Sequence, residues 1–149
     1  MKKIKIIWII SLIIVVLTSL GVSLYFYNTP SDDEKIIIDW AQERNKYLKY
    51  KDSFKIISVK INKESDYCII QYSFEDEQGK DHTFKEVWEL HDNKIDTNIG
   101  NLYNTEATDL SVGYLDYTSD LLKEIATEVE NDKHTLSFNS ARITRFINE

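Results

Sequence analysis

The sequence predicts an α+β protein in which a single N-terminal transmembrane helix precedes a small domain of an antiparallel β-meander packed against two amphipathic helices. Three observations lead to this fold class. An uncharged apolar run spans residues 6–27, alternating apolar and polar residues fill 54–99, and apolar residues recur at helical spacing on either side of that stretch. Each such element has one apolar face, and packing the elements together buries those faces.

Residues 6–27 are predicted to be a transmembrane anchor in contact with the lipid bilayer. At a rise of about 1.5 Å per residue the run reaches about 33 Å, enough to cross a hydrocarbon core of about 30 Å. It contains no proline, so a helix can satisfy every backbone polar group within the segment. Trp8 and the aromatic residues 25–27 stand near its two ends, where aromatic side chains mark the membrane interfaces.

The charges flanking this run predict its direction. Lys2, Lys3 and Lys5 precede it, so the positive-inside rule makes residues 1–5 a cytoplasmic tail and places residues 31–149 outside the cell membrane. The alternative is a signal peptide cleaved near Gly21. An uncleaved anchor is favoured, because the apolar run exceeds the about 7–15 residues of a signal core and no A-x-A sequence follows it.

Residues 31–149 have the length of one domain and a strongly acidic composition. They contain all 25 acidic residues and fifteen of the 18 basic ones, which gives a net charge of −10. Such a domain repels nucleic acid and anionic lipid surfaces and favours a basic protein partner. Solubility alone is the other explanation of this acidity.

The single cysteine, Cys68, cannot form an intramolecular disulfide, so the apolar core must hold the domain together. Cys68 has the same strand parity as Ile70, Tyr72 and Phe74. We therefore expect it to be buried and to behave as a small apolar residue.

The first element of the domain is an amphipathic helix. Ser31 and Glu34 have the spacing of a capping box, which predicts the helix start. Residues at helical spacing continue it to about Tyr50: Ile37, Trp40, Ala41, Arg44 and Leu48.

Four strands with short connections follow and predict the meander. They cover residues 54–61, 66–74, 81–90 and 95–99. Ile57, Val59 and Ile61 are expected on one face of the first strand. In the third, the inward positions are Phe84, Trp88 and Leu90.

A second amphipathic helix is predicted from Tyr114 to about Asn131. Its apolar residues fall within one narrow arc: Leu115, Leu122, Ile125, Ala126 and Val129. Residues 134–138 read as a strand, and 141–147 as either a strand or a short helix capped by Asn139 or Ser140. The helices are expected against one face of the sheet.

Sequence motifs for catalysis, cofactors or metals are lacking. His82, His91 and His134 are scattered, with neither H-E-x-x-H nor C-x-x-C, and four glycines form no phosphate loop or nucleophile elbow. Residues 92–98 fail the calcium-loop pattern because a lysine occupies the third position. We expect no catalytic residue, no cofactor, no metal and no enzymatic activity.

Glu86 interrupts the inward parity of the third strand. It is either a partly buried carboxylate or, as favoured here, a strand-edge glutamate paired with a lysine.

The candidate partner-binding residues form an acidic stripe on the second helix: Asp116, Asp120, Glu124 and Glu128. Like charges four residues apart cost about 0.2–0.5 kcal/mol per pair, and helix propensity does not require them. A solvated face of an acidic protein also explains the stripe. A third alternative is neutralisation by Arg142 or Arg145.

The layout, a short cytoplasmic tail, one anchor and one small acidic domain outside, resembles two bacterial groups: tethered toxin-immunity proteins and prophage superinfection-exclusion proteins. The excess of lysine over arginine and the many isoleucines and asparagines are also typical of AT-rich bacterial genomes. The resemblance implies a membrane-anchored extracytoplasmic protein-binding module with a protective function. The alternatives are a structural subunit of an envelope secretion or conjugation complex and a secreted small hydrolase.

Overall fold

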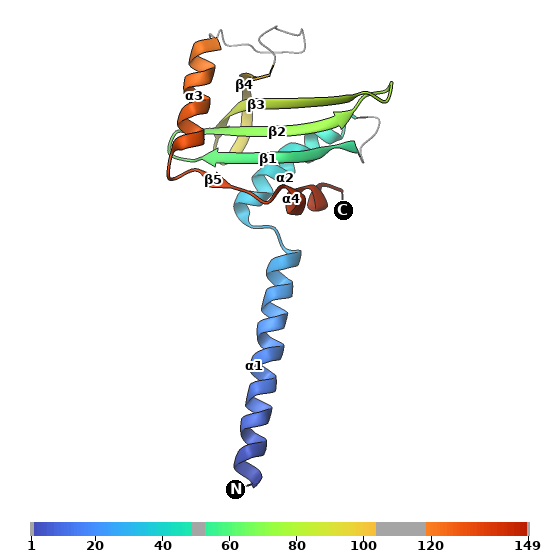
Figure 1. Ribbon diagram of the computed structural model, residues 1–149, viewed down its shortest axis with the longest axis vertical. Coiled ribbons are helices and arrows are strands. Elements are labelled where there is room, and N and C mark those ends of the chain that lie inside the picture. The colour runs from blue at the N-terminus through green and yellow to red at the C-terminus, as the bar shows by residue number, and fades with distance from the viewer. Residues whose placement is uncertain (1, 49–52, 104–118, 149) are drawn as a thin grey trace. The chain divides into compact units, whose positions relative to one another are not determined.

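The computed structural model describes residues 2–48, 53–103 and 119–148 (Figure 1). It contains a long N-terminal apolar helix, an open five-stranded antiparallel sheet and further helices, which confirms the predicted α+β fold class. The elements in chain order are α1 (Lys2–Asn28), α2 (Asp32–Asn45), β1 (Lys55–Asn62), β2 (Tyr67–Glu75), β3 (Asp81–His91), β4 (Lys94–Asn101), α3 (Ser119–Asn131), β5 (Leu136–Ser137) and α4 (Ser140–Asn148). The chain divides into two compact units, Met1–Asp33 and Glu34–Glu149.

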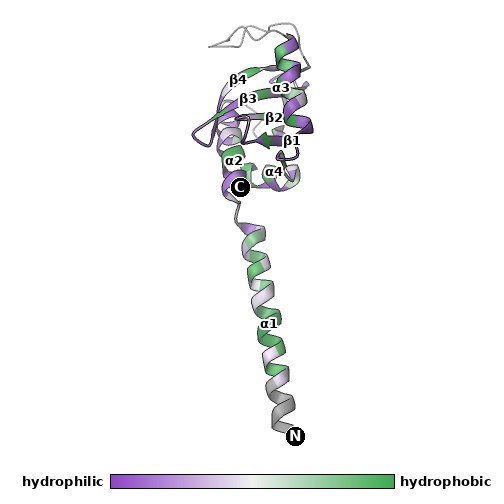
Figure 2. Cartoon of the chain, turned by 90° about the vertical axis from the view of Figure 1, so that its left-hand side faces the viewer, coloured by the Kyte–Doolittle hydropathy of each residue, from purple (hydrophilic) through white to green (hydrophobic). Residues whose placement is uncertain are grey.

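Helix α1 runs without a break through the apolar segment (Figure 2). Its side chains from Trp8 onward are exposed. Among the described residues it contains the only segment long and apolar enough to cross a membrane. The hydroxyl of Thr18 donates to the carbonyls of Ile14 and Val15, and that of Ser19 to the carbonyl of Val16, each at 2.9 Å. These bonds satisfy polar side chains within the helix, as a lipid environment requires.

The sheet has the strand order β4-β3-β2-β1-β5, with every neighbouring pair antiparallel. Strands β1 to β4 are therefore the predicted meander. The turn joining β3 to β4 uses Asp92 and Asn93 at φ 50° and 59°, the left-handed conformation of a two-residue hairpin loop. The strand predicted in residues 134–138 is the two-residue β5, which pairs with Lys60 and Ile61 of β1.

A β-bulge in β1 overturns the predicted alternation of that strand. The register to β2 shifts between Ile56 and Ser58, so Ile56, Val59 and Ile61 are buried while Ile57 is 42% exposed. Because a bulge inserts one extra residue, it reverses the parity of everything before it. The expectation that Ile57 shares a face with Val59 and Ile61 is therefore wrong.

The sheet is covered on both faces, not on one as expected (Figure 1). Helices α2 and α4 contribute Ile37, Trp40 and Ile143 to a large core cluster on one face. Helix α3 contributes Ile125, Ala126 and Val129 to a smaller cluster with Ile69, Val87 and Ile99 on the other. Ile69 and Val87 are buried, and so are their neighbours along each strand, whose side chains point to the opposite face of the sheet. Strands β2 and β3 therefore carry apolar residues on both faces.

The structure corrects the predicted end of helix α2 and decides between the two alternatives for residues 141–147. Helix α2 begins directly after Ser31, as the capping box predicts, but it ends at Asn45 and not near Tyr50. Residues 140–148 form helix α4, and Asn139 Oδ1 accepts a hydrogen bond from the Arg142 N–H at 3.1 Å, which identifies Asn139 as its cap. Part of the second predicted amphipathic helix, residues 114–118, lies outside the described residues.

Cys68 is fully buried and its thiol is free, as predicted. It lies opposite Trp88 in the ladder between β2 and β3. Burial raises the pKa of its thiol well above the ordinary range, so the thiol stays protonated and unreactive.

Replacing Cys68 with serine should lower the free energy of unfolding by about 1–3 kcal/mol, because burying a hydroxyl in this apolar site costs more than burying a thiol. Urea denaturation of the two proteins measures the difference. A native wild-type thiol that reacts at once with a maleimide would contradict this burial.

Candidate functional site

Helix α3 holds three of the four predicted partner-binding residues, Asp120, Glu124 and Glu128, and packs closely on the sheet. Leu122 approaches Gly100 of β4 so tightly that a Cβ at that glycine would lie 2.9 Å from Leu122 Cδ2. Lys85 of β3 donates to Glu130 Oε1 at 2.8 Å and lowers the pKa of that carboxyl. These contacts fix which side of α3 faces outward.

Three of the four predicted acids, Asp120, Glu124 and Glu128, lie exposed on that outward side, while Asp116 falls outside the described residues. We call these three residues the acidic face. Within the described part of the chain, no hydrogen bond or ion pair involves any of their carboxylates. Figure 2 shows hydrophilic and hydrophobic residues side by side on this helix. The structure thus brings the three acids together at spacings of four residues.

Among the described residues, Arg142 does not pair with the acidic face. Its Nε donates to Glu34 Oε1 at 2.7 Å and its Nη2 to Oε2 at 3.4 Å, so the guanidinium is engaged with helix α2. Arg145 stacks on Phe146, with Cζ 4.6 Å from the ring centroid.

Glu86 is a buried carboxylate and not a strand-edge residue paired with a lysine. It lies on β3, between β2 and β4, and is 6% exposed. Its Oε2 accepts from Arg44 Nη2 at 2.8 Å and from Trp88 Nε1 at 3.0 Å. The favoured prediction for this residue is therefore wrong, because its partner comes from helix α2 across the core.

Three aromatic rings surround the guanidinium of Arg44. Its Cζ lies 5.2 Å from the ring centroid of Trp40, 5.4 Å from that of Tyr72 and 4.7 Å from that of Trp88. Arg44 Nη2 also donates to the Tyr72 hydroxyl at 3.0 Å. Burial, and then the charge of Glu86, raises the pKa of Tyr72, so its phenol is neutral. We call Trp40, Tyr72, Trp88 and Glu86 the aromatic cage.

Sequence reasoning did not identify this cage, although part of the signal was present. Trp40 and Arg44 are four residues apart and so share a helix face, and Glu86 shares the strand parity of Trp88. What the sequence could not supply is the register that puts the end of α2 over the middle of β3.

A second polar cluster stabilises the turn between β2 and β3. Asp76 Oδ1 accepts from the backbone N–H groups of Gln78 and Lys80 at 2.9 Å, and Oδ2 lies 2.6 Å from His82 Nε2. The hydrogen bond from His82, followed by that from the Lys80 N–H, lowers the pKa of Asp76 to about 2. Across the described residues, no three His, Cys, Asp or Glu side chains come together as metal ligands.

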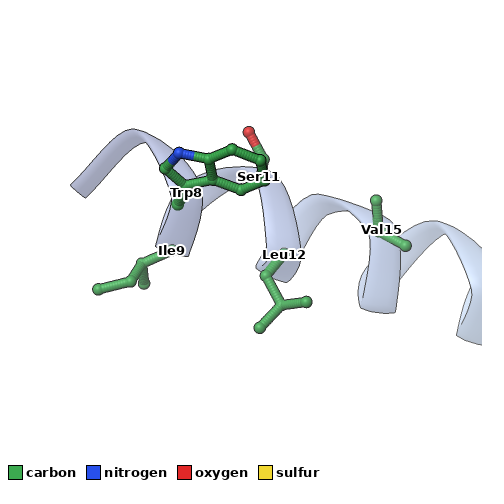
Figure 3. Close-up of a pocket in the computed structure, with 5 residues that line it drawn as sticks. All are labelled: Trp8, Ile9, Ser11, Leu12 and Val15. Carbon is green, nitrogen blue, oxygen red and sulfur yellow. The ribbon is translucent and has the colours of Figure 1, made fainter. Parts of the chain in front are cut away.

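Side chains of α1 also form a shallow apolar hollow, lined by Trp8, Ile9, Ser11, Leu12 and Val15 (Figure 3). All five belong to one helix, and the residues around the hollow are exposed. The hollow is therefore a gap between exposed side chains of one helix and not an enclosed ligand site.

Comparison with known proteins gives no relative: no family model, curated protein or solved structure matches the chain.

Replacing Asp76 with asparagine should lower the melting temperature at neutral pH. Because its pKa falls from the ordinary 3.8 to about 2 in the folded chain, the contribution of Asp76 is complete above the ordinary value. This stabilising contribution is lost as the pH falls through the pKa that Asp76 has in the folded chain. The difference in melting temperature between the variant and the wild type should therefore disappear at that pH. Melting curves across this range test it, with Glu77→Gln, an exposed residue of the same turn, as the matched control.

Proposed function

We propose that the chain is a single-pass, membrane-anchored protein-binding module, and not an enzyme, whose domain lies outside the cell membrane. Its partner is a basic protein that docks on the acidic face. The observation that carries the proposal is the exposure of Asp120, Glu124 and Glu128 on the outward side of α3, without a cationic partner among the described residues.

Electrostatics support a basic partner. The acidic face belongs to a domain of net charge −10. The negative charges of the face and of the rest of the domain add up to a long-range field that attracts cations. Charge complementarity of this kind acts mainly on the rate of encounter and weakens as salt rises. Binding should therefore be fastest at low ionic strength and fall as the Debye length shrinks to about 8 Å at 0.15 M.

A protective role in bacteria is the biological setting we propose for this module. A domain tethered at the outer surface of the membrane sits where a toxin acts or where phage DNA enters. The layout resembles that of immunity and superinfection-exclusion proteins, and this resemblance of architecture supports the setting.

The topology makes a direct prediction. Protease added to cells whose outer membrane surface is accessible should digest residues 31–149 and leave a membrane-bound stub containing residues 6–27, because the lysine-rich tail stays inside. A cytoplasmic membrane protein with the opposite topology serves as the control. Recovery of a mature protein beginning at Val22 in the medium would show that the segment is a signal peptide.

Neutralising the acidic stripe should abolish partner binding without lowering the stability of the domain. The variant Asp116→Asn, Asp120→Asn, Glu124→Gln, Glu128→Gln should keep or slightly raise the melting temperature, since each relieved like-charge pair gains about 0.2–0.5 kcal/mol. A photo-crosslinking amino acid at Thr127, exposed on the same helix, should capture a partner in cells, and the variant should lose that crosslink.

The matched control removes four other exposed acids, through Asp39→Asn, Glu43→Gln, Glu77→Gln and Asp96→Asn. It makes the same change in net charge but leaves α3 intact, so the crosslink should persist. A stripe variant that loses stability would mean internal pairing of these acids. A variant that keeps the full crosslink would place the docking surface elsewhere.

A further inference from the structure

The aromatic cage has the composition of a cation receptor. Three rings from α2, β2 and β3 and one carboxylate converge on a single planar cation, and all four cage residues are buried. Aromatic faces and a nearby carboxylate are the groups by which proteins recognise organic cations. We propose that the cage is a guanidinium-binding site, filled by Arg44 in the free chain and able to accept an external guanidinium group in its place.

The walls of the cage support one another without Arg44. Trp40 meets Tyr72 and Trp88 edge to face, each at 5.4 Å between centroids. Tyr72 also stacks on Phe54 and Phe84, both at 5.4 Å. The indole N–H of Trp88 donates to Glu86, which fixes the carboxylate in the absence of any cation. The site is therefore largely preorganised, which reduces the cost of binding a ligand.

The geometry favours a guanidinium over an ammonium. Arg44 Nη2 donates hydrogen bonds to both Glu86 Oε2, at 2.8 Å, and the Tyr72 hydroxyl, at 3.0 Å. The guanidinium carbon remains near the rings at the same time. A flat, delocalised cation can stack on a ring and donate in its own plane at once, whereas an ammonium is a compact and strongly hydrated point charge.

Arg44 fills the site incompletely. Its side chain is 32% exposed, so the cage opens to solvent at this position. Its Nε is buried and has no acceptor among the residues that the structure describes. Arg142, by contrast, uses both Nε and Nη2 to bind Glu34. Arg44 also precedes the last residue of α2, where the helix ends and the side chain can withdraw with little disturbance.

An external ligand has to compete with a ligand that is already tethered. A side chain attached next to its site acts at an effective concentration in the millimolar range or above. A free guanidinium compound can bind only those wild-type cages that Arg44 leaves open. Its apparent affinity is therefore the intrinsic affinity multiplied by the fraction of open cages. Removing the Arg44 side chain should therefore reveal the site. The cage is formed by α2, β2 and β3 and shares no residue with the acidic face of α3.

The test uses the full chain in detergent micelles, with Trp8→Phe so that Trp40 and Trp88 are the only tryptophans. The variant Arg44→Ala should melt at a lower temperature than its parent. Millimolar methylguanidinium should raise that temperature and change the tryptophan fluorescence, both along one saturable curve. Methylammonium at the same ionic strength should do neither. The parent should need at least about tenfold more methylguanidinium for the same fluorescence change.

Arg142→Ala is the matched control, because it removes the arginine of a second arginine–glutamate pair, in which Phe146 is the one ring near the Arg142 guanidinium among the described residues. Equal rescue of both variants, equal rescue by methylammonium, or no saturable rescue of Arg44→Ala would overturn the proposal. Should Arg44→Ala fail to fold, Arg44→Gln replaces it under the same criteria. Agmatine and a tripeptide amide with a central arginine then distinguish the source. Binding of the peptide shows that the site admits an arginine side chain of a protein, and binding of agmatine alone restricts the ligand to a small guanidinium compound.

Discussion

Helix α2 is tied to the rest of the domain by an arginine–glutamate pair near each end, and the larger core is built around that attachment. Glu34 pairs with Arg142 of α4, and Arg44 pairs with Glu86 of β3. Between the two pairs, Ile37 and Ala41 are completely buried. Breaking one such pair costs about 3–5 kcal/mol because a charge is left uncompensated, whereas replacing both partners with apolar groups is often neutral. The pairs therefore fix where α2 sits more than they add net stability.

The sheet can serve two cores because its central strands are apolar on both sides. Cys68 and Ile70 face α2 and α4, while Ile69 between them faces α3. The cluster under α3 is the smaller one, and it holds the helix with one narrow stripe of apolar residues. This leaves most of the helix circumference free for charge. An acidic surface can therefore be presented there without placing any carboxylate in the core.

The sequence patterns predicted what depends on local spacing. The parity of Cys68, the amphipathic face of α3 and the meander follow from periods of 3.6 and 2 residues, and all appear in the structure. The bulge at Ile57 was not predictable, because one inserted residue leaves no periodic trace in so short a strand. Nor was the partner of Glu86, since Arg44 lies 42 residues away and only tertiary packing joins them. The same holds for Glu34 and Arg142, which are 108 residues apart.

The magnitudes indicate what the acidic face can and cannot do. Asp120 with Glu124 and Glu124 with Glu128 make two like-charge pairs, at about 0.2–0.5 kcal/mol each in an exposed helix. Against a typical domain stability of about 5–15 kcal/mol this repulsion is small, so folding alone neither forbids nor explains the three acids. Their effect on an approaching cation is larger in proportion, because steering can change association rates by about 10-fold to 1000-fold. If the face has a function, it should therefore appear in salt-dependent association rates, not in the stability of the domain.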